Sequence, residues 1–285
     1  MKKITPIYLM IMMSVFLVIP NSAHATCSIS DADPAVVTVD DNNCSVQPAQ
    51  YGIKMYQMYL CTSEPTAPTT SAAGVYTSCN LILNSDSGSR VDMTGTGAAG
   101  SFPGATFTRP PPGTYTHGYM LLDNVFYLKY AAKFNESKEG SKSGTDNGVF
   151  CATEAGTGNE STGASTSCGS SAITAGEWGA QLTSFNGAAS CLAIVTASNL
   201  GGTTNSITGI LETSAGVRTG DCSDVDKLAG IQTFGTPIVI TKDLKSFNIA
   251  FQVSEGMTIW ESGDTPPVIN MGSGPFQAII TTVDY

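Results

Sequence analysis

The sequence has few charged side chains, and basic ones are the scarcest. Lysine and arginine number 13 against 23 aspartates and glutamates, and together these four types make up 13% of the 285 residues. The net charge of −10 repels nucleic acid and anionic membranes, and no cluster of basic residues interleaved with aromatics offsets it. We therefore expect no nucleic-acid partner.

Signatures of catalysis and of cofactor binding are also missing. Only one of the two histidines, His117, lies beyond residue 25, and no pair of cysteines has the C-x2-C spacing of a zinc site. The chain has no G-x-S-x-G elbow, and its glycine-rich pieces lack the lysine of a phosphate-binding loop. The sequence predicts no catalytic residue, no cofactor and no enzyme.

Long apolar runs are absent except for one at the N-terminus. Residues 7–19 are almost wholly apolar, follow Lys2 and Lys3, and precede the small residues Ala23 and Ala25. This order is typical of a secretory signal, and the run is shorter than the roughly 20 residues that a membrane-spanning helix needs. We expect residues 1–25 to be cleaved and no transmembrane helix to follow. The remaining chain would carry 11 basic and 23 acidic residues, a net charge of −12.

Cysteines, in contrast, are plentiful for an exported chain. All eight lie beyond residue 25: Cys27, Cys44, Cys61, Cys79, Cys151, Cys168, Cys191 and Cys222. An even number in an oxidising compartment indicates disulfides, and we predict sequential pairing that closes four local loops. The expected location is extracellular or at the cell surface, reached through the periplasm in a Gram-negative bacterium.

Short runs of β-branched and aromatic residues, separated by Gly, Pro, Asn and Asp, predict an all-β protein. We expect an antiparallel β-sandwich, one large or two smaller, with few short helices. The strands are expected at 35–39, 51–61, 76–83, 114–134, 191–196, 206–212, 237–241, 246–253, 257–261 and 276–283. The run 114–134 is too long for one strand, so Asp123-Asn124 is expected to form a hairpin turn, and residues 223–229 a short helix.

Residues 135–176 differ from the rest because Gly, Ser, Thr, Asn and Glu dominate them. They are expected to be a long loop or a linker between residues 26–134 and 177–285, which form the two parts of the sandwich. Pro111-Pro112-Gly113-Thr114-Tyr115 resembles the Pro-Gly-x-Tyr start of a strand in prealbumin-like sandwich domains of secreted and surface proteins. The resemblance covers five of 285 residues and implies only the sandwich class.

Two groups of side chains are candidate binding sites. Asp221, Asp224 and Asp226 form an oxygen-rich cluster that could hold calcium, although Asp residues also make turns. Trp178 and Trp260 each neighbour a glutamate, Glu177 and Glu261, and aromatic rings with paired acids are what a glycoside hydrolase uses.

The last residues read as a strand, with Phe276, Ala278, Ile280 and Val283 as a candidate strand-exchange segment. This strand either joins its own sheet or pairs with a second copy, as extracellular fibres do by β-augmentation. The favoured function is an exported structural protein of the cell surface, a pilus-like filament subunit or adhesin. The alternative is a secreted glycan-binding module or a glycoside hydrolase-like enzyme.

Overall fold

The computed structural model describes residues 26–39, 43–94, 102–142, 147–160, 163–185, 191–263 and 265–285, so the expected signal lies outside it. Those residues are all-β, as predicted, and Leu200–Gly202 form a 3-10 turn. The strands are β1 (Ser28–Ile29), β2 (Val36–Thr38), β3 (Asn43–Val46), β4 (Gln50–Cys61), β5 (Cys79–Asp92), β6 (Thr106–Phe107), β7 (Gly113–Lys129), β8 (Ala131–Gly140), β9 (Asn147–Thr153), β10 (Gly156–Asn159), β11 (Thr166–Gly169), β12 (Trp178–Gln181), β13 (Ile194–Ser198), β14 (Ser206–Glu212), β15 (Lys227–Ile240), β16 (Leu244–Gln252), β17 (Met257–Ser262), β18 (Val268–Ser273) and β19 (Gln277–Asp284).

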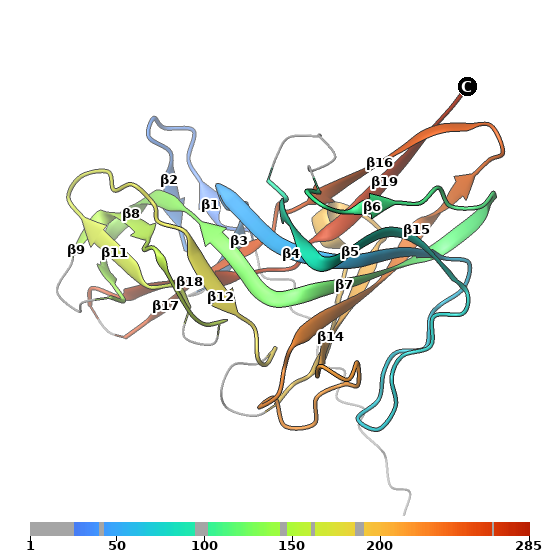
Figure 1. Cartoon of the computed structure of the whole chain (residues 1–285). Helices are drawn as coiled ribbons and strands as arrows, with labels where there is room; N and C mark the ends of the chain where they lie inside the picture. The colour runs from blue at the N-terminus through green and yellow to red at the C-terminus, as the bar shows by residue number, and fades with distance from the viewer. Residues whose placement is uncertain are drawn as a thin grey trace, which may run out of the picture.

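The strands form two large sheets and one ribbon. An eight-stranded sheet has the order β1-β2-β8-β18-β17-β3, with β9 and β11 beside β8. A nine-stranded sheet has the order β13-β14-β15-β7-β4-β5-β6, with β12 and β10 beside β7. Strands β16 and β19 make a two-stranded antiparallel ribbon. In Figure 1 the eight-stranded sheet occupies one end of the molecule, and β6, β15 and the ribbon occupy the other.

The ribbon covers one face of the nine-stranded sheet through aromatic side chains. Tyr51 of β4 stacks on Phe126 of β7 with ring centroids 5.7 Å apart. Phe276 lies edge-on to both rings, and Phe251 of β16 completes the cluster 6.1 Å from Phe276. Such edge-to-face contacts add to the area buried. The layered arrangement is that of the predicted sandwich.

All eight cysteines pair in sequence order, as predicted: Cys27–Cys44, Cys61–Cys79, Cys151–Cys168 and Cys191–Cys222. Two of the bonds join residues directly opposite each other on adjacent antiparallel strands, Cys61 with Cys79 and Cys151 with Cys168. The disulfides therefore link strands that are already neighbours. β7 begins at Gly113, and the buried Tyr115 donates a hydrogen bond to the carbonyl of Pro111, 2.7 Å away.

Two local predictions were wrong. Asp123-Asn124 is not a turn, because β7 runs through it and the amide of Asn124 donates to the carbonyls of Leu182 and Val225. Residues 223–229 are not a helix, since β15 already begins at Lys227 and pairs with β14 and β7. In both places contacts with distant strands outweigh the local signal.

The segment 135–176 is also not a long loop or linker in its described residues. It holds the end of β8 and the whole of β9, β10 and β11. Strands from before and after this segment lie together in both large sheets. In one sheet β3 pairs with β17, and in the other β7 pairs with both β4 and β15. The polar composition is explained by side chains that bond inward: the buried Thr166 donates to the carbonyl of Ile269 at 2.8 Å.

Candidate functional site

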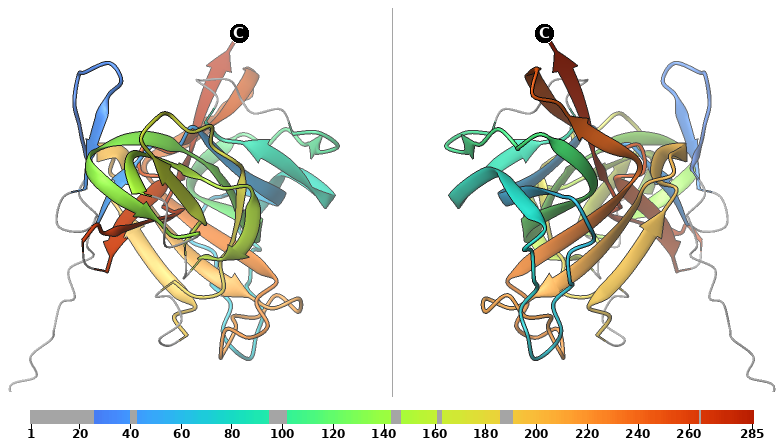
Figure 2. Two further views of the ribbon diagram at one scale, coloured as in Figure 1. Left: turned by 90° about the vertical axis from the view of Figure 1, so that its left-hand side faces the viewer. Right: turned by 90° about the vertical axis from the view of Figure 1, so that its right-hand side faces the viewer.

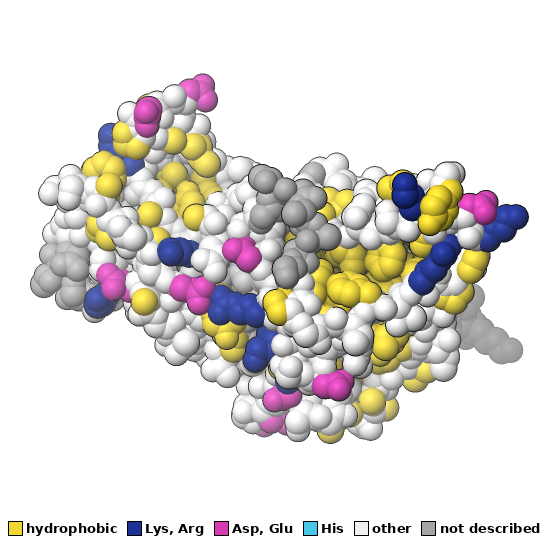
Figure 3. Space-filling model, turned by 45° about the horizontal axis from the view of Figure 1, so that its top comes forward, with side chains coloured by type: hydrophobic (Ala, Val, Ile, Leu, Met, Phe, Trp, Pro, Cys, Tyr) yellow, Lys and Arg dark blue, Asp and Glu magenta, His cyan; other side chains and the backbone are white. Residues whose placement is uncertain are grey.

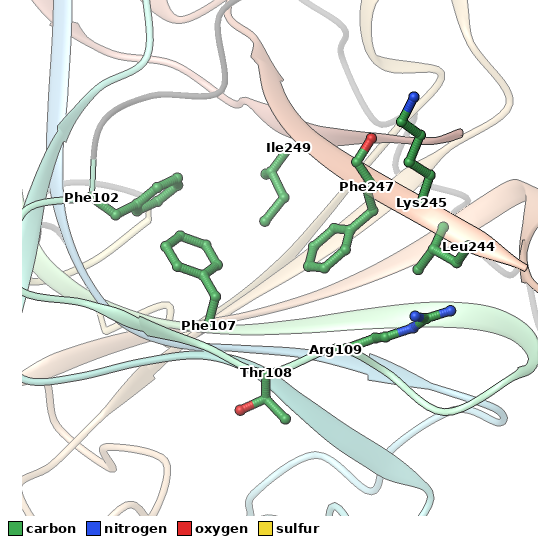
Figure 4. A pocket seen from close by; sticks show the side chains of 9 residues that line it. Phe102, Phe107, Thr108, Arg109, Leu244, Lys245, Phe247 and Ile249 are labelled. Carbon is green, nitrogen blue, oxygen red and sulfur yellow. The ribbon is translucent and has the colours of Figure 1, made fainter. Parts of the chain in front are cut away.

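A groove lies open at the edge of the sandwich between β6 and β16 (Figures 3 and 4). Its cavity volume is about 350 Å³. Its lining comes from two distant segments: Phe102, Phe107, Thr108 and Arg109 on one side, and Leu244, Lys245, Ser246, Phe247 and Ile249 on the other. Figure 4 shows Phe107 pointing across the groove toward the side of Phe247 and Ile249.

Side chains at the edge of the hydrophobic core form the floor of the groove. Phe102, Leu244 and Ile249 are buried there, whereas Phe247 is half-buried and Phe107 is 52% exposed. A half-exposed aromatic ring beside buried apolar side chains indicates a site where an apolar group of a ligand or partner can bind.

Both walls of the groove are strand edges. β6 pairs with β5 through Phe107 and Thr106, and β16 pairs with β19 along its length. In the described part of the chain, no strand pairs with the opposite edge of β6 or of β16. Backbone groups at such edges are available to an added strand, so the groove can take an extended peptide by β-augmentation.

One end of the groove is basic. Arg109 and Lys245 are exposed in its lining, which contains no acidic side chain. A guanidinium N–H of Arg109 donates to the carbonyl of Lys242, 3.1 Å away, which ties the β6 side to the turn before β16. In so acidic a chain, this arrangement favours a ligand that combines apolar and acidic side chains.

The candidate strand-exchange segment lies in the sheet of its own chain. β19 pairs with β16 from Gln277, opposite Gln252, to Asp284, opposite Leu244. Phe276 and Ala278 are buried, Ile280 is half-buried, and Val283 is 45% exposed. The first half of β19 is therefore part of the core, and only the half beyond Ala278 reaches the surface, where the ribbon projects (Figure 2).

Gln232 of β15 also holds the first half of β19, a role that the sequence did not reveal. Its side-chain amide donates to the carbonyl of Ala278 at 2.8 Å and accepts from the N–H of the same residue at 2.9 Å. The side chain of Gln232 thus makes the two backbone hydrogen bonds that a neighbouring strand would otherwise make with Ala278 on that edge of β19. The only signal in the sequence is a glutamine within an otherwise apolar run.

The three calcium candidates do not converge. Asp221 accepts from the N–H and hydroxyl of Ser223, Asp224 accepts from the Thr219 hydroxyl, and Asp226 pairs with Lys227. Within the described residues, no group of three or more His, Cys, Asp or Glu side chains is placed to hold a metal ion. Asp221 and Asp224 thus stabilise the turn between Thr219 and Asp224, and Asp226 forms an ion pair.

Neither tryptophan lines the groove. Trp178 is buried and lies so close to Gly156 and Gly158 that a Cβ atom at either would collide with its ring. Trp260 packs in the same way on Gly163 and Gly272. Their neighbours are also engaged, because Glu177 pairs with Arg90 at 2.7 Å and Glu261 with Lys138 at 2.5 Å.

The fold and the site define a disulfide-bonded, all-β protein with an open groove at a sheet edge. Four disulfides indicate an oxidising environment, extracellular or periplasmic. Among the described residues, no helix has the length and apolar character needed to cross a membrane. No protein-family model matches the chain, and no curated protein or solved structure matches it either.

Proposed function

We propose that this protein is an exported structural subunit of the cell surface that associates with copies of itself through β-strand edges. The observation that carries the proposal is the groove, where two strand edges and a half-exposed Phe107 flank an apolar floor. A single chain leaves these groups in water, and an added strand covers them.

The rest of the molecule supports a structural role. The disulfides stiffen neighbouring strands, charge is sparse, and the carboxylates singled out from the sequence are engaged in turns or ion pairs. The alternative of a glycan-binding protein or hydrolase has less support, since both tryptophans pack on glycines of the same chain.

The proposal predicts self-association that depends on the groove. The oxidised chain from Thr26 onward, concentrated without detergent, is expected to form oligomers or filaments in light scattering and negative-stain electron microscopy. Phe107→Glu places a charge in the groove and is expected to leave a folded monomer, because the exposed ring contributes little to the core. Val75→Glu is the matched control: Val75 is 50% exposed but lies outside the groove lining, so this variant is expected to assemble.

Two results would contradict the proposal. One is a wild-type chain that stays monomeric at the highest concentration reached. The other is equal assembly of Phe107→Glu and Val75→Glu, which would separate association from the groove.

A further inference from the structure

We infer that the occupant of the groove is the N-terminal arm of a second copy of this chain. The arm consists of β1 and residues 30–35, which project from the body of the molecule (Figure 2), whereas β2, which follows, pairs with β8 and buries Val37. The inference rests on the proposed function, because it names the segment through which the copies associate.

The arm has the chemistry that the groove favours. Residues 28–35 are all exposed, and Ile29, 52% exposed, lies outside the core at the rim of an open cavity beside Tyr130 and Phe150. Asp31 and Asp33 lie at the tip, and no lysine or arginine occurs between residues 26 and 53. The arm therefore offers an exposed apolar side chain and two carboxylates within five residues.

The groove supplies the complementary groups. Phe107 and Phe247 present apolar surface to Ile29, and Arg109 and Lys245 present positive charge to the acidic tip. Lys242 adds a third basic side chain at that end, where Asp243 and Asp284 also lie. Opposite charges on facing surfaces steer association and fix its orientation.

The volume of the groove is large enough for the side chains of a short peptide segment but not for the surface of a whole domain. About 350 Å³ lies at the lower end of the range for pockets that bind small ligands, roughly 300–1,000 Å³. It can take the side chains of a few residues of an extended segment, while the backbone of that segment pairs with the edge of β6 or β16.

The arm and the groove lie toward opposite ends of the molecule. In Figure 1, β1 and β2 form one edge of the eight-stranded sheet, whereas β6 and β16 are beyond the middle of the nine-stranded sheet. Figure 3 shows acidic side chains on the projection at one end and basic side chains around the apolar hollow at the other. An arm so placed reaches the groove of another copy, and each copy then offers its own arm to the next. Such a head-to-tail contact generates a chain of subunits unless its rotation closes a ring.

Charge reversal on each side of this contact tests the inference. The arm variant is Asp31→Lys/Asp33→Lys, and the groove variant is Arg109→Glu/Lys245→Glu. All four side chains are exposed, so both variants are expected to fold, which circular dichroism and thermal unfolding check. Each variant alone sets like charges against each other, and the concentration for half-assembly is expected to rise about tenfold or more.

An equimolar mixture of the two variants is expected to restore assembly. The reversed arm then meets a reversed groove, and the unreversed arm of the groove variant meets the unreversed groove of the arm variant. Glu64→Lys/Asp226→Lys is the matched control, since it changes the net charge as the arm variant does but leaves arm and groove intact. It is expected to assemble like the wild type.

The outcomes separate this inference from the proposed function. If the wild type assembles and the arm variant assembles equally well, another segment fills the groove and the inference is overturned while self-association stands. A mixture that stays monomeric while the wild type assembles also overturns it. If the wild type does not associate at all, both proposals fail together.

Discussion

Replacing Lys138 by methionine is expected to lower the free energy of unfolding by about 3–5 kcal/mol, the cost of breaking a buried ion pair by removing one partner. Lys138 is only 1% exposed, and its ammonium lies 2.5 Å from a carboxylate oxygen of Glu261 and 2.7 Å from one of Glu136. The Glu261 side chain is 13% exposed, so it would keep a largely buried charge with no cation beside it. Urea unfolding of the oxidised protein, followed by tryptophan fluorescence, measures the loss.

The double variant Lys138→Met/Glu261→Met is the informative companion. Replacing both members of a buried pair by apolar side chains is often neutral, so this variant is expected to recover most of the lost stability. Glu136→Gln is the control for the exposed partner, whose side chain is 61% exposed, and is expected to change stability by less than about 1 kcal/mol. A double variant as unstable as Lys138→Met would show that the lysine stem, rather than its charge, holds β8 near β17.

The strands of this fold could be predicted where the local pattern and the tertiary contacts agree. Residues 206–212 coincide with β14, and Phe247, Ile249 and Phe251 of the expected strand 246–253 face the core. Sequential disulfide pairing also succeeded, because chain neighbours such as β4 and β5 are neighbours in the sheet. Hydrophobic alternation and turn spacing report on this local order.

The segments that could not be predicted bury polar side chains. Thr166 is fully buried and bonds to Ser141 as well as to Ile269, so a run rich in Ser, Thr and Gly forms strands without apolar alternation. Asn124 similarly has the sequence signal of a turn residue, but in the structure its side-chain amide donates to two carbonyls that are distant in the chain. Satisfied buried polar groups leave no periodic signal in the sequence.

The groove could not be predicted for a different reason. Its walls come from residues 102–109 and 244–249, which are far apart in the chain. The alternation of β16 identifies an apolar face, but it does not say which part of that face another strand covers. Ile249 is buried and Phe247 is half-buried, and both line the groove opposite Phe107 at the end of β6. The groove therefore depends on how distant strands are arranged in the fold, which local sequence patterns do not report.

Glu160→Gln is expected to raise stability at alkaline pH, by roughly 2–4 kcal/mol at pH 8.5. The carboxyl lies beside Trp260, one of its oxygens accepts the N–H of Ser273, and the other, Oε2, is buried. Burial raises its pKa from 4.5 to about 8, and the Ser273 hydrogen bonds offset only part of that rise. The folded protein therefore keeps the proton between pH 4.5 and 8 while the unfolded chain releases it. Stability falls as pH rises through this window and levels off above it.

Unfolding curves of the wild type and of Glu160→Gln between pH 5 and 9 measure this effect as a difference. Burial also raises the pKa of Glu212, to about 7, and this carboxyl adds a decline of the same sign to both proteins. The difference between the two curves thus isolates Glu160, and Glu212→Gln is the parallel variant that leaves the Glu160 contribution in place. The amide of glutamine has the shape of the protonated carboxyl, so little else changes.

The same measurement bears on function, because a carboxyl with a raised pKa beside a tryptophan is also the arrangement of a general acid. A catalytic acid has to be within reach of its substrate, whereas the carboxyl of Glu160 lies against Gly272 and Trp260 with its Oε2 buried. If the stability difference between Glu160→Gln and the wild type grows as pH rises, the carboxyl is shielded from water and stays protonated in the folded protein. That result is compatible with a structural subunit. Parallel curves would mean that the carboxylate is ionised and hydrated in the folded protein. The Trp260 region would then be open to water, and a glycan ligand there would become the stronger hypothesis.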